Sequence, residues 1–107
     1  MKILDNEGYP TDEFLEYVKK YDCSDIMTFL ETIESAWAYS DWGFKLTKTY
    51  KGNHWQNKKQ KTLQLHTAGW SGNESIIEAL SSNFIFCSMY WWKTYRGGHY
   101  YFQIPIN

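Results

Sequence analysis

The sequence predicts an α+β fold, with a four-stranded, mainly antiparallel sheet, helices packed on one face and the element order ααββαββ. In residues 1–41 apolar side chains recur every three or four positions, which is the helix period. Beyond Gly43 they alternate every second residue, which is the strand period. Because 107 residues are too few for two cores, we expect residues 1–107 to form a single domain.

Two helices are expected in residues 1–41, the acidic helical part of the chain. The first begins at Thr11, whose hydroxyl can cap it, and ends at Lys20. The second carries its apolar stripe from Ile26 to Trp37. Both stripes predict amphipathic helices that bury one side.

Residues 42–107 are expected to form the ββαββ part of the domain. Strands are expected over 44–50 and 62–66, then a helix that begins within 69–73, and further strands over 84–92 and 99–104. The run 84–92 is almost wholly apolar, which is typical of a central strand covered on both faces.

Charge is distributed unevenly along the chain. Residues 1–41 carry a net charge of −7, whereas residues 42–107 carry +6. The simplest interpretation is a set of solvated helix faces and strand edges, and the alternative is a basic surface for a phosphate-bearing partner. Arg96 is the one arginine, and dense phosphate contacts usually recruit more, which argues against duplex DNA as a partner.

Several functional classes are not expected. There is no run of about 18 apolar residues that would span a membrane. Residues 1–10 lack the apolar segment of a signal peptide. Cys23 and Cys87 fit a reducing cytosol better than secretion, and the three histidines have no zinc-ligand spacing. We therefore expect a cytoplasmic protein that needs neither a metal nor a cofactor.

A first candidate binding motif spans 65–74. Ser71 and Glu74 have the spacing of a capping box at a helix N-terminus. Gly72 is a poor helix former in the first turn, but it would let an anionic ligand approach the exposed amides. The alternative is a capped helix that binds nothing. The motif is not a P-loop, because its Lys-Ser/Thr ending is missing.

A second candidate motif is the turn and strand start at 96–101. Its two glycines can make a hairpin turn without any further role. An arginine among aromatic rings is also suited to holding a phosphate and stacking a base. If the two motifs meet in one pocket, the expected ligand-binding residues are His66, Trp70, Ser71, Gly72, Asn73, Arg96, Gly97, Gly98, His99 and Tyr101.

The strand period also predicts a polar sheet face turned away from the helices. Adjacency of the strands is assumed here. The face would carry Lys45, Thr47, Gln64, His66, His99, Tyr101 and Gln103. Such a face is a plausible stacking platform for a base or a sugar.

Catalysis has weaker support in the sequence. The two-histidine phosphoesterase pattern needs Ser or Thr two positions after each histidine, and Ala68 and Tyr101 stand there instead. A hydrolase that uses His66 or His99 with Glu74 remains an alternative.

Aromatic residues are unusually frequent, at 20% of the chain. One small core does not need so many, so some should be exposed at an interface, either with a partner protein or in a homodimer. The expected exposed rings are among Trp42, Trp55, Trp70, Tyr95 and Tyr101, with Trp55 the best candidate.

The segments 66–74 and 96–102 resemble a family of small phage-encoded proteins of uncharacterised function. The resemblance covers roughly residues 42–104 and departs at Ala68, where the family pattern has Gly. It implies a short viral protein in a bacterial host cytoplasm, in a class that often inhibits host defence. It implies no catalytic residues.

We therefore expect a non-enzymatic binding protein of phage origin, with an anti-defence role, that recognises a nucleotide or another phosphate-bearing ligand. One alternative is a protein–protein inhibitor of a host enzyme that uses its acidic helices or exposed aromatics. A second alternative is a small phosphoesterase-like enzyme.

Overall fold

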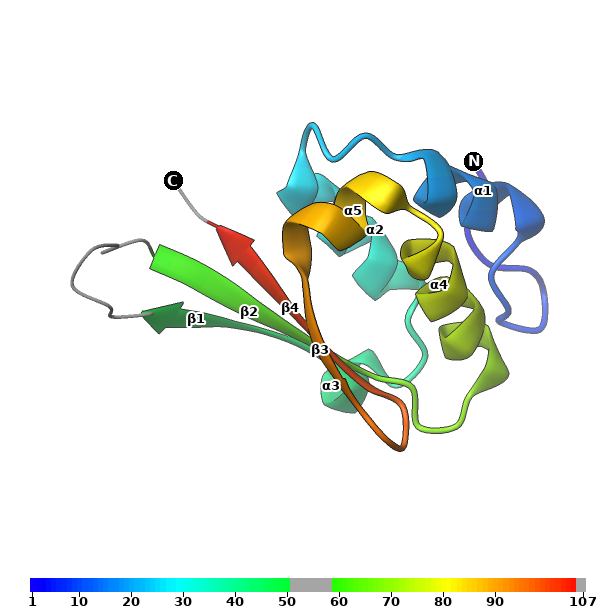
Figure 1. Ribbon diagram of the computed structural model, residues 1–107. Coiled ribbons are helices and arrows are strands. Elements are labelled where there is room, and N and C mark those ends of the chain that lie inside the picture. The colour runs from blue at the N-terminus through cyan, green and yellow to red at the C-terminus, as the bar shows by residue number, and fades with distance from the viewer. Residues whose placement is uncertain (51–58, 106–107) are drawn as a thin grey trace.

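A computed structural model describes residues 1–50 and 59–105, which form a sheet with the longer helices gathered on one side (Figure 1). The expected α+β class and the four-stranded antiparallel sheet are confirmed. The elements are α1 (Asp12–Lys20), α2 (Ile26–Ala36), α3 (Ser40–Gly43), β1 (Phe44–Tyr50), β2 (Lys59–His66), α4 (Ser71–Ser81), α5 (Phe84–Tyr90), β3 (Trp91–Tyr95) and β4 (His99–Pro105).

The strands lie in the order β1-β2-β4-β3 and every neighbouring pair is antiparallel. The last strand therefore lies in the middle of the sheet beside β2, with Leu63 opposite Phe102 and His66 opposite His99. At the edge, the register of β3 against β4 shifts between Trp91 and Lys93. The arrangement brings two segments that are far apart in sequence side by side.

The core lies between the sheet and the helix layer. Leu63, Leu65 and Phe102 alternate along β2 and β4 and are fully buried, as the strand period predicts. Phe86 of α5 packs on Phe102 with ring centroids 5.3 Å apart, and on Phe29 of α2 at 5.9 Å. These rings join the two layers.

The expected strand over 84–92 is wrong. Residues Phe84–Tyr90 form helix α5, capped by the side chain of Asn83, which accepts a hydrogen bond from the Phe86 N–H. Phe86 and Tyr90 are four positions apart and both are buried, whereas Phe84 is 82% exposed. A short apolar run fits a buried strand and a helix equally well, and here the N-cap selects the helix.

The segment between α2 and β1 also differs from the expectation. Helix α2 ends at Ala36, and a separate turn of helix, α3, begins after Tyr39. Tyr39 adopts a left-handed conformation with φ of 58°. This change of direction places Trp42 beside the end of β2, where its ring lies 5.6 Å from the His66 ring.

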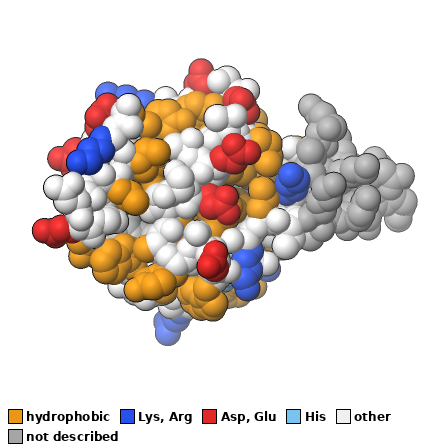
Figure 2. All heavy atoms as spheres, turned by 180° about the vertical axis from the view of Figure 1, so that it is seen from behind, with side chains coloured by type: hydrophobic (Ala, Val, Ile, Leu, Met, Phe, Trp, Pro, Cys, Tyr) orange, Lys and Arg blue, Asp and Glu red, His pale blue; other side chains and the backbone are white. Residues whose placement is uncertain are grey.

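Seen from behind, the surface of the helical body carries acidic side chains with hydrophobic side chains between them (Figure 2). Within the described ranges, no helix has the length and apolar character that a membrane crossing would require.

Candidate functional site

The two candidate motifs lie against each other. The Thr67 N–H, immediately after β2, donates a hydrogen bond of 3.0 Å to the Gly98 carbonyl in the β3–β4 turn. Gly97 and Gly98 both have positive φ, and a side chain on Gly98 would collide with the Thr67 hydroxyl. The turn therefore needs glycine here both for its conformation and for its close approach to β2.

At the start of α4, however, the candidate residues serve the fold. Asn73 is fully buried, and its carboxamide bonds the Ala38 N–H, the Ala38 carbonyl and the Thr67 carbonyl. Gly72 is buried because the Trp70 indole and Pro10 pack against its Cα, where a Cβ would lie 2.7 Å from Trp70 Nε1. These contacts explain Gly72 and Asn73 without a ligand.

The expected capping box is also absent. Trp70 occupies the N-cap position of α4, without a side-chain cap, and its ring stacks on Tyr9 at 4.9 Å. Ser71 is the first helical residue instead of the cap, and Glu74 is exposed in the first turn. The helix therefore starts one residue earlier than the spacing predicts, with its N-cap residue stacked on Tyr9.

The sheet face turned away from the helix layer, here called the outer face, is the stronger candidate site. It carries polar and aromatic side chains from all four strands, placed there by strand alternation and by their mutual contacts. They are Lys45, Thr47, Gln64, His66, Lys93, Tyr95, His99, Tyr101 and Gln103. The adjacency of β2 to β4 and of β1 to β2, assumed from the sequence, is confirmed.

His66 and His99 are directly opposite each other on this face. Because Thr67 and Gly98 hold the hydrogen-bonded position next to them, the histidines occupy a non-hydrogen-bonded pair, in which side chains lie closest. Their Nδ1 atoms are 2.6 Å apart. Gln64 Oε1 lies 3.3 Å from His66 Nε2, and since a carbonyl oxygen only accepts, this nitrogen carries the proton.

The environment of His66 favours its neutral form. Burial lowers the pKa of His66 below its ordinary value, and the nearby His99 and Lys45 lower it further by repelling positive charge. The Trp42 and Tyr101 rings flank the imidazole, with centroids 5.6 and 6.0 Å away. In this tautomer the His66 Nε2–H is taken up by Gln64, and His99 Nε2 is the acceptor that the pair presents.

Next to the histidines, Lys93 lies among rings on the outer face. Its ammonium is 4.1 Å from the centroid of Trp92, 5.1 Å from that of Tyr95 and 5.2 Å from that of Tyr101. Tyr95 and Tyr101 meet edge to face at 5.4 Å. A cation held over several rings provides both a charge and flat apolar surfaces.

The remaining expected residues are distributed as follows. Arg96 is exposed in the β3–β4 turn. Trp42 and Tyr95 are exposed as expected, whereas Trp70 and Tyr101 are only half-exposed. Trp55 lies outside the described residues.

One feature that sequence reasoning missed is an open hollow of about 370 Å³ lined by Tyr39, Trp42 and Ala68. It borders His66 through Trp42. Tyr39 is 67% exposed, and its left-handed backbone conformation leaves no local signal in the sequence. This hollow extends the aromatic surface beyond the end of β2.

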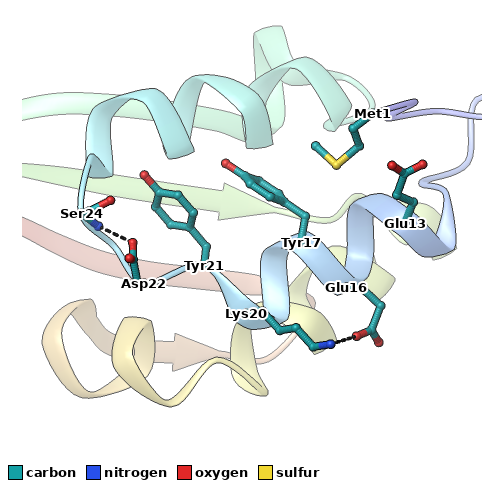
Figure 3. Close-up of a pocket in the computed structure, with 8 residues that line it drawn as sticks. All are labelled: Met1, Glu13, Glu16, Tyr17, Lys20, Tyr21, Asp22 and Ser24. Carbon is teal, nitrogen blue, oxygen red and sulfur yellow. Dashed lines mark hydrogen bonds and ion pairs between the residues drawn. The ribbon is translucent and has the colours of Figure 1, made fainter.

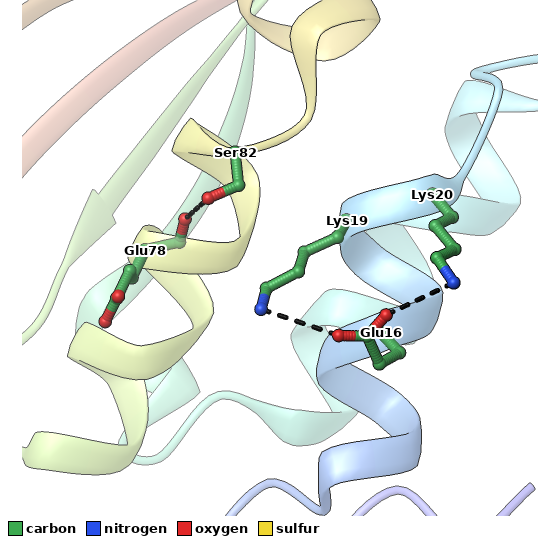
Figure 4. Close-up of polar contacts among 5 residues, drawn as sticks. All are labelled: Glu16, Lys19, Lys20, Glu78 and Ser82. Atoms are coloured by element: carbon green, nitrogen blue, oxygen red, sulfur yellow. Dashed lines mark hydrogen bonds and ion pairs between the residues drawn. The ribbon is translucent and has the colours of Figure 1, made fainter.

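A larger, shallow groove of about 610 Å³ follows α1 (Figure 3). Tyr17 and Tyr21 line its floor and pack on the core residue Phe29. Of its charges, Glu16 is paired with Lys19 at 3.6 Å and Lys20 at 3.4 Å (Figure 4). The groove is built from core-packing rings and exposed ion pairs, and we assign no ligand to it.

The two cysteines are free and half-buried. Burial raises the pKa of both thiols, and Asp22 raises that of Cys23 further. Cys87 Sγ lies 3.2 Å from the Leu80 carbonyl. Neither thiol has the electropositive surroundings of a reactive cysteine.

The structure defines the class of this chain by its architecture, an α+β domain with a four-stranded antiparallel sheet among the described residues. No family model, no curated protein and no solved structure matches this chain.

Proposed function

We propose that the chain is a non-enzymatic binding protein whose outer face holds a nucleotide or another phosphate-bearing ligand. The observation that carries this proposal is the absence of acidic residues from all four strands. The strands contain neither Asp nor Glu, and of their five lysines Lys45 and Lys93 lie on the outer face. The acids of the chain lie outside the strands, so the outer face carries only positive formal charge although the whole protein carries −1.

The outer face also matches the two chemical parts of a nucleotide. Lys45 and Lys93 supply positive charge, and Arg96 extends it at one end. Tyr95 and Tyr101 supply ring surfaces on which a base can stack, a contact worth about 1–3 kcal/mol per base. The His66–His99 pair supplies hydrogen-bonding groups between these parts.

This proposal moves the site away from the start of α4. Gly72 and Asn73 are buried in packing and hydrogen bonds, so we assign them a supporting role. His66, His99, Tyr101 and the turn at 96–98 stay in the proposed site. A catalytic role has no comparable support, because no hydrogen bond or ion pair between described residues joins Glu74 to either histidine.

Calorimetric titration with mono-, di- and cyclic nucleotides tests the proposal. Tyr101→Ala removes a stacking ring and should weaken binding about tenfold or more. Lys45→Ala and Arg96→Ala remove charge and should weaken it and reduce its salt dependence. Lys19→Ala, on α1, is the matched control and should bind like the wild type. No binding of any of these nucleotides, or binding that the outer-face variants leave unchanged, would contradict the proposal.

We further propose that the protein is phage-encoded and acts against host defence by sequestering such a ligand in the bacterial cytoplasm. The support is the resemblance in segments 66–74 and 96–102. Mass spectrometry of small molecules released from protein purified out of bacterial cells tests it. We expect a nucleotide to be released from the purified protein. Recovery of the protein without a bound nucleotide, together with failure of the titrations, would oppose the anti-defence proposal.

A protein partner is the second candidate, favoured by apolar side chains that α5 leaves exposed. Phe84, Ile85 and Met89 on α5 and Trp92 just after it are all exposed. Cross-linking in bacterial cells distinguishes the candidates. An adduct that is lost in Phe84→Glu but retained in Arg96→Ala would favour the partner over the nucleotide.

A further inference from the structure

We propose that His66 and His99 together form a binding site for a transition-metal ion of the Zn²⁺, Ni²⁺ and Cu²⁺ class. The proposal does not depend on the nucleotide site. The two imidazoles come from adjacent strands and meet with their Nδ1 atoms 2.6 Å apart and their ring planes at 65°. No local sequence spacing indicates this metal site, because its two ligands are 33 residues apart.

The backbone holds the two ligands in place. The Thr67 N–H bonds the Gly98 carbonyl immediately beside them, and Trp37 Nε1 donates to the His66 carbonyl at 3.2 Å. Gly43 allows this approach, because a Cβ there would lie 2.5 Å from the His66 carbonyl oxygen. The Cα positions of the pair are therefore fixed by the sheet and the core, and only the rings need to move.

The required movement is small. Bonds of about 2.0–2.1 Å from Zn²⁺ to nitrogen in tetrahedral geometry place two ligand atoms about 3.3 Å apart. The Nδ1 atoms would separate by roughly 0.7 Å from their 2.6 Å contact, and both rings would turn so that their Nδ1 lone pairs point at the metal instead of at each other.

The proton balance is also simple. Gln64 Oε1 accepts from His66 Nε2, so His66 Nδ1 already presents a lone pair. The bridging proton therefore sits on His99 Nδ1 and must move to Nε2 of the same ring through solvent, which reaches the half-exposed His99. Both imidazoles stay neutral, and no proton is released overall.

The surroundings select the class of metal. Imidazole nitrogen suits Zn²⁺, Ni²⁺ and Cu²⁺, whereas Mg²⁺ and Ca²⁺ need oxygen ligands. The described residues contain no third His, Cys, Asp or Glu that would complete a cluster with the pair. Water or an anionic oxygen of a bound ligand would fill the other positions, so we expect an open site that contributes little to folding.

Titration of the full-length protein with ZnCl₂ tests the site, with MgCl₂ as the hard-cation control. In nitrogen-detected NMR of the imidazoles, Zn²⁺ should shift the Nδ1 resonances of both His66 and His99, and Mg²⁺ should shift neither. This measurement uses the unaltered protein and so does not depend on any variant folding. A Zn²⁺ titration that shifts neither ring, or only one, would overturn the proposal.

Variants then locate the binding by calorimetry. His66→Gln and His99→Gln should each lose the Zn²⁺ isotherm. His54→Gln and the double variant Cys23→Ser/Cys87→Ser should keep it, which separates the pair from the third histidine and from the thiols. Gln64→Ala removes the orienting partner of His66 and should weaken binding about tenfold. Retention of full binding in both single-histidine variants, or its loss in the cysteine variant, would refute the site.

Discussion

Asn73 hydrogen-bonds both polar backbone groups of Ala38: its Oδ1 accepts from the N–H at 2.9 Å, and its Nδ2 donates to the carbonyl at 2.9 Å. Ala38 follows α2 and Asn73 lies in the first turn of α4, 35 residues later. One fully buried carboxamide thus ties the segment between α2 and α3 to helix α4.

We expect Asn73→Ala to lower the free energy of unfolding by about 3 kcal/mol, because it leaves buried backbone groups of Ala38 and Thr67 unpaired. Urea denaturation measures this. Ser71→Ala is the matched control two residues away, exposed and without a capping bond, and should change stability by less than about 0.5 kcal/mol. A stable Asn73→Ala variant that fails only in ligand binding would instead restore the role that the sequence predicts for this residue.

Gly72→Ala should destabilise the protein by about 1 kcal/mol or more, although alanine normally favours a helix over glycine. The new methyl group would press on the Trp70 indole and on Pro10. Thermal melts give the effect, and the near-ultraviolet circular dichroism of Trp70 should change as its stacking on Tyr9 is disturbed. In a Trp70→Phe background the loss of stability caused by Gly72→Ala should be smaller. An equal loss there would show that the new methyl group does not clash with the Trp70 indole.

Asn83→Asp should destabilise by about 2–4 kcal/mol. The carboxylate still accepts from the Phe86 N–H, but it loses the amide donor that bonds the Val18 and Tyr21 carbonyls at 2.8 and 2.9 Å. The matched control is Asp25→Asn at the N-cap of α2, where the two residues cap equally well and little change is expected. Equal stability of both variants in urea would show that the ties from Asn83 to α1 contribute little.

Phe86→Ala should cost about 3–5 kcal/mol, whereas Phe84→Ala should cost less than about 0.5 kcal/mol. In a helix these side chains point in different directions, and only Phe86 is buried. In a strand, positions 84 and 86 would share one face and lose similar amounts. Chemical denaturation of the two variants therefore tests helix α5 directly.

Periodicity predicts most of this fold because most helices and strands bury only one face in the core. Leu63 and Leu65 alternate with polar neighbours, and Phe14 and Val18 recur at helical spacing, so each element shows its buried side. The run Phe84–Tyr90 has no such contrast, since exposed and buried positions are both apolar. Its N-cap, Asn83, is the local signal that would have indicated the helix.

The candidate site is only partly readable from the sequence. The strand period places His66 and His99 on the same face, but their contact depends on the register between β2 and β4. The helix start at Trp70 depends on stacking with Tyr9, 61 residues earlier, which no local spacing encodes. Long-range packing therefore decided both where the histidines meet and where α4 begins.

The hydrogen bond from the Trp37 indole to the His66 carbonyl has an optical consequence. Trp37 is buried in the core, yet its indole N–H is bonded to the backbone of His66, whose ring belongs to the outer face. Indole emission depends on the strength of that hydrogen bond, so a ligand on the outer face that shifts the His66 backbone should change the emission wavelength of Trp37. A tryptophan in the core would in this way report binding on the other face of the sheet.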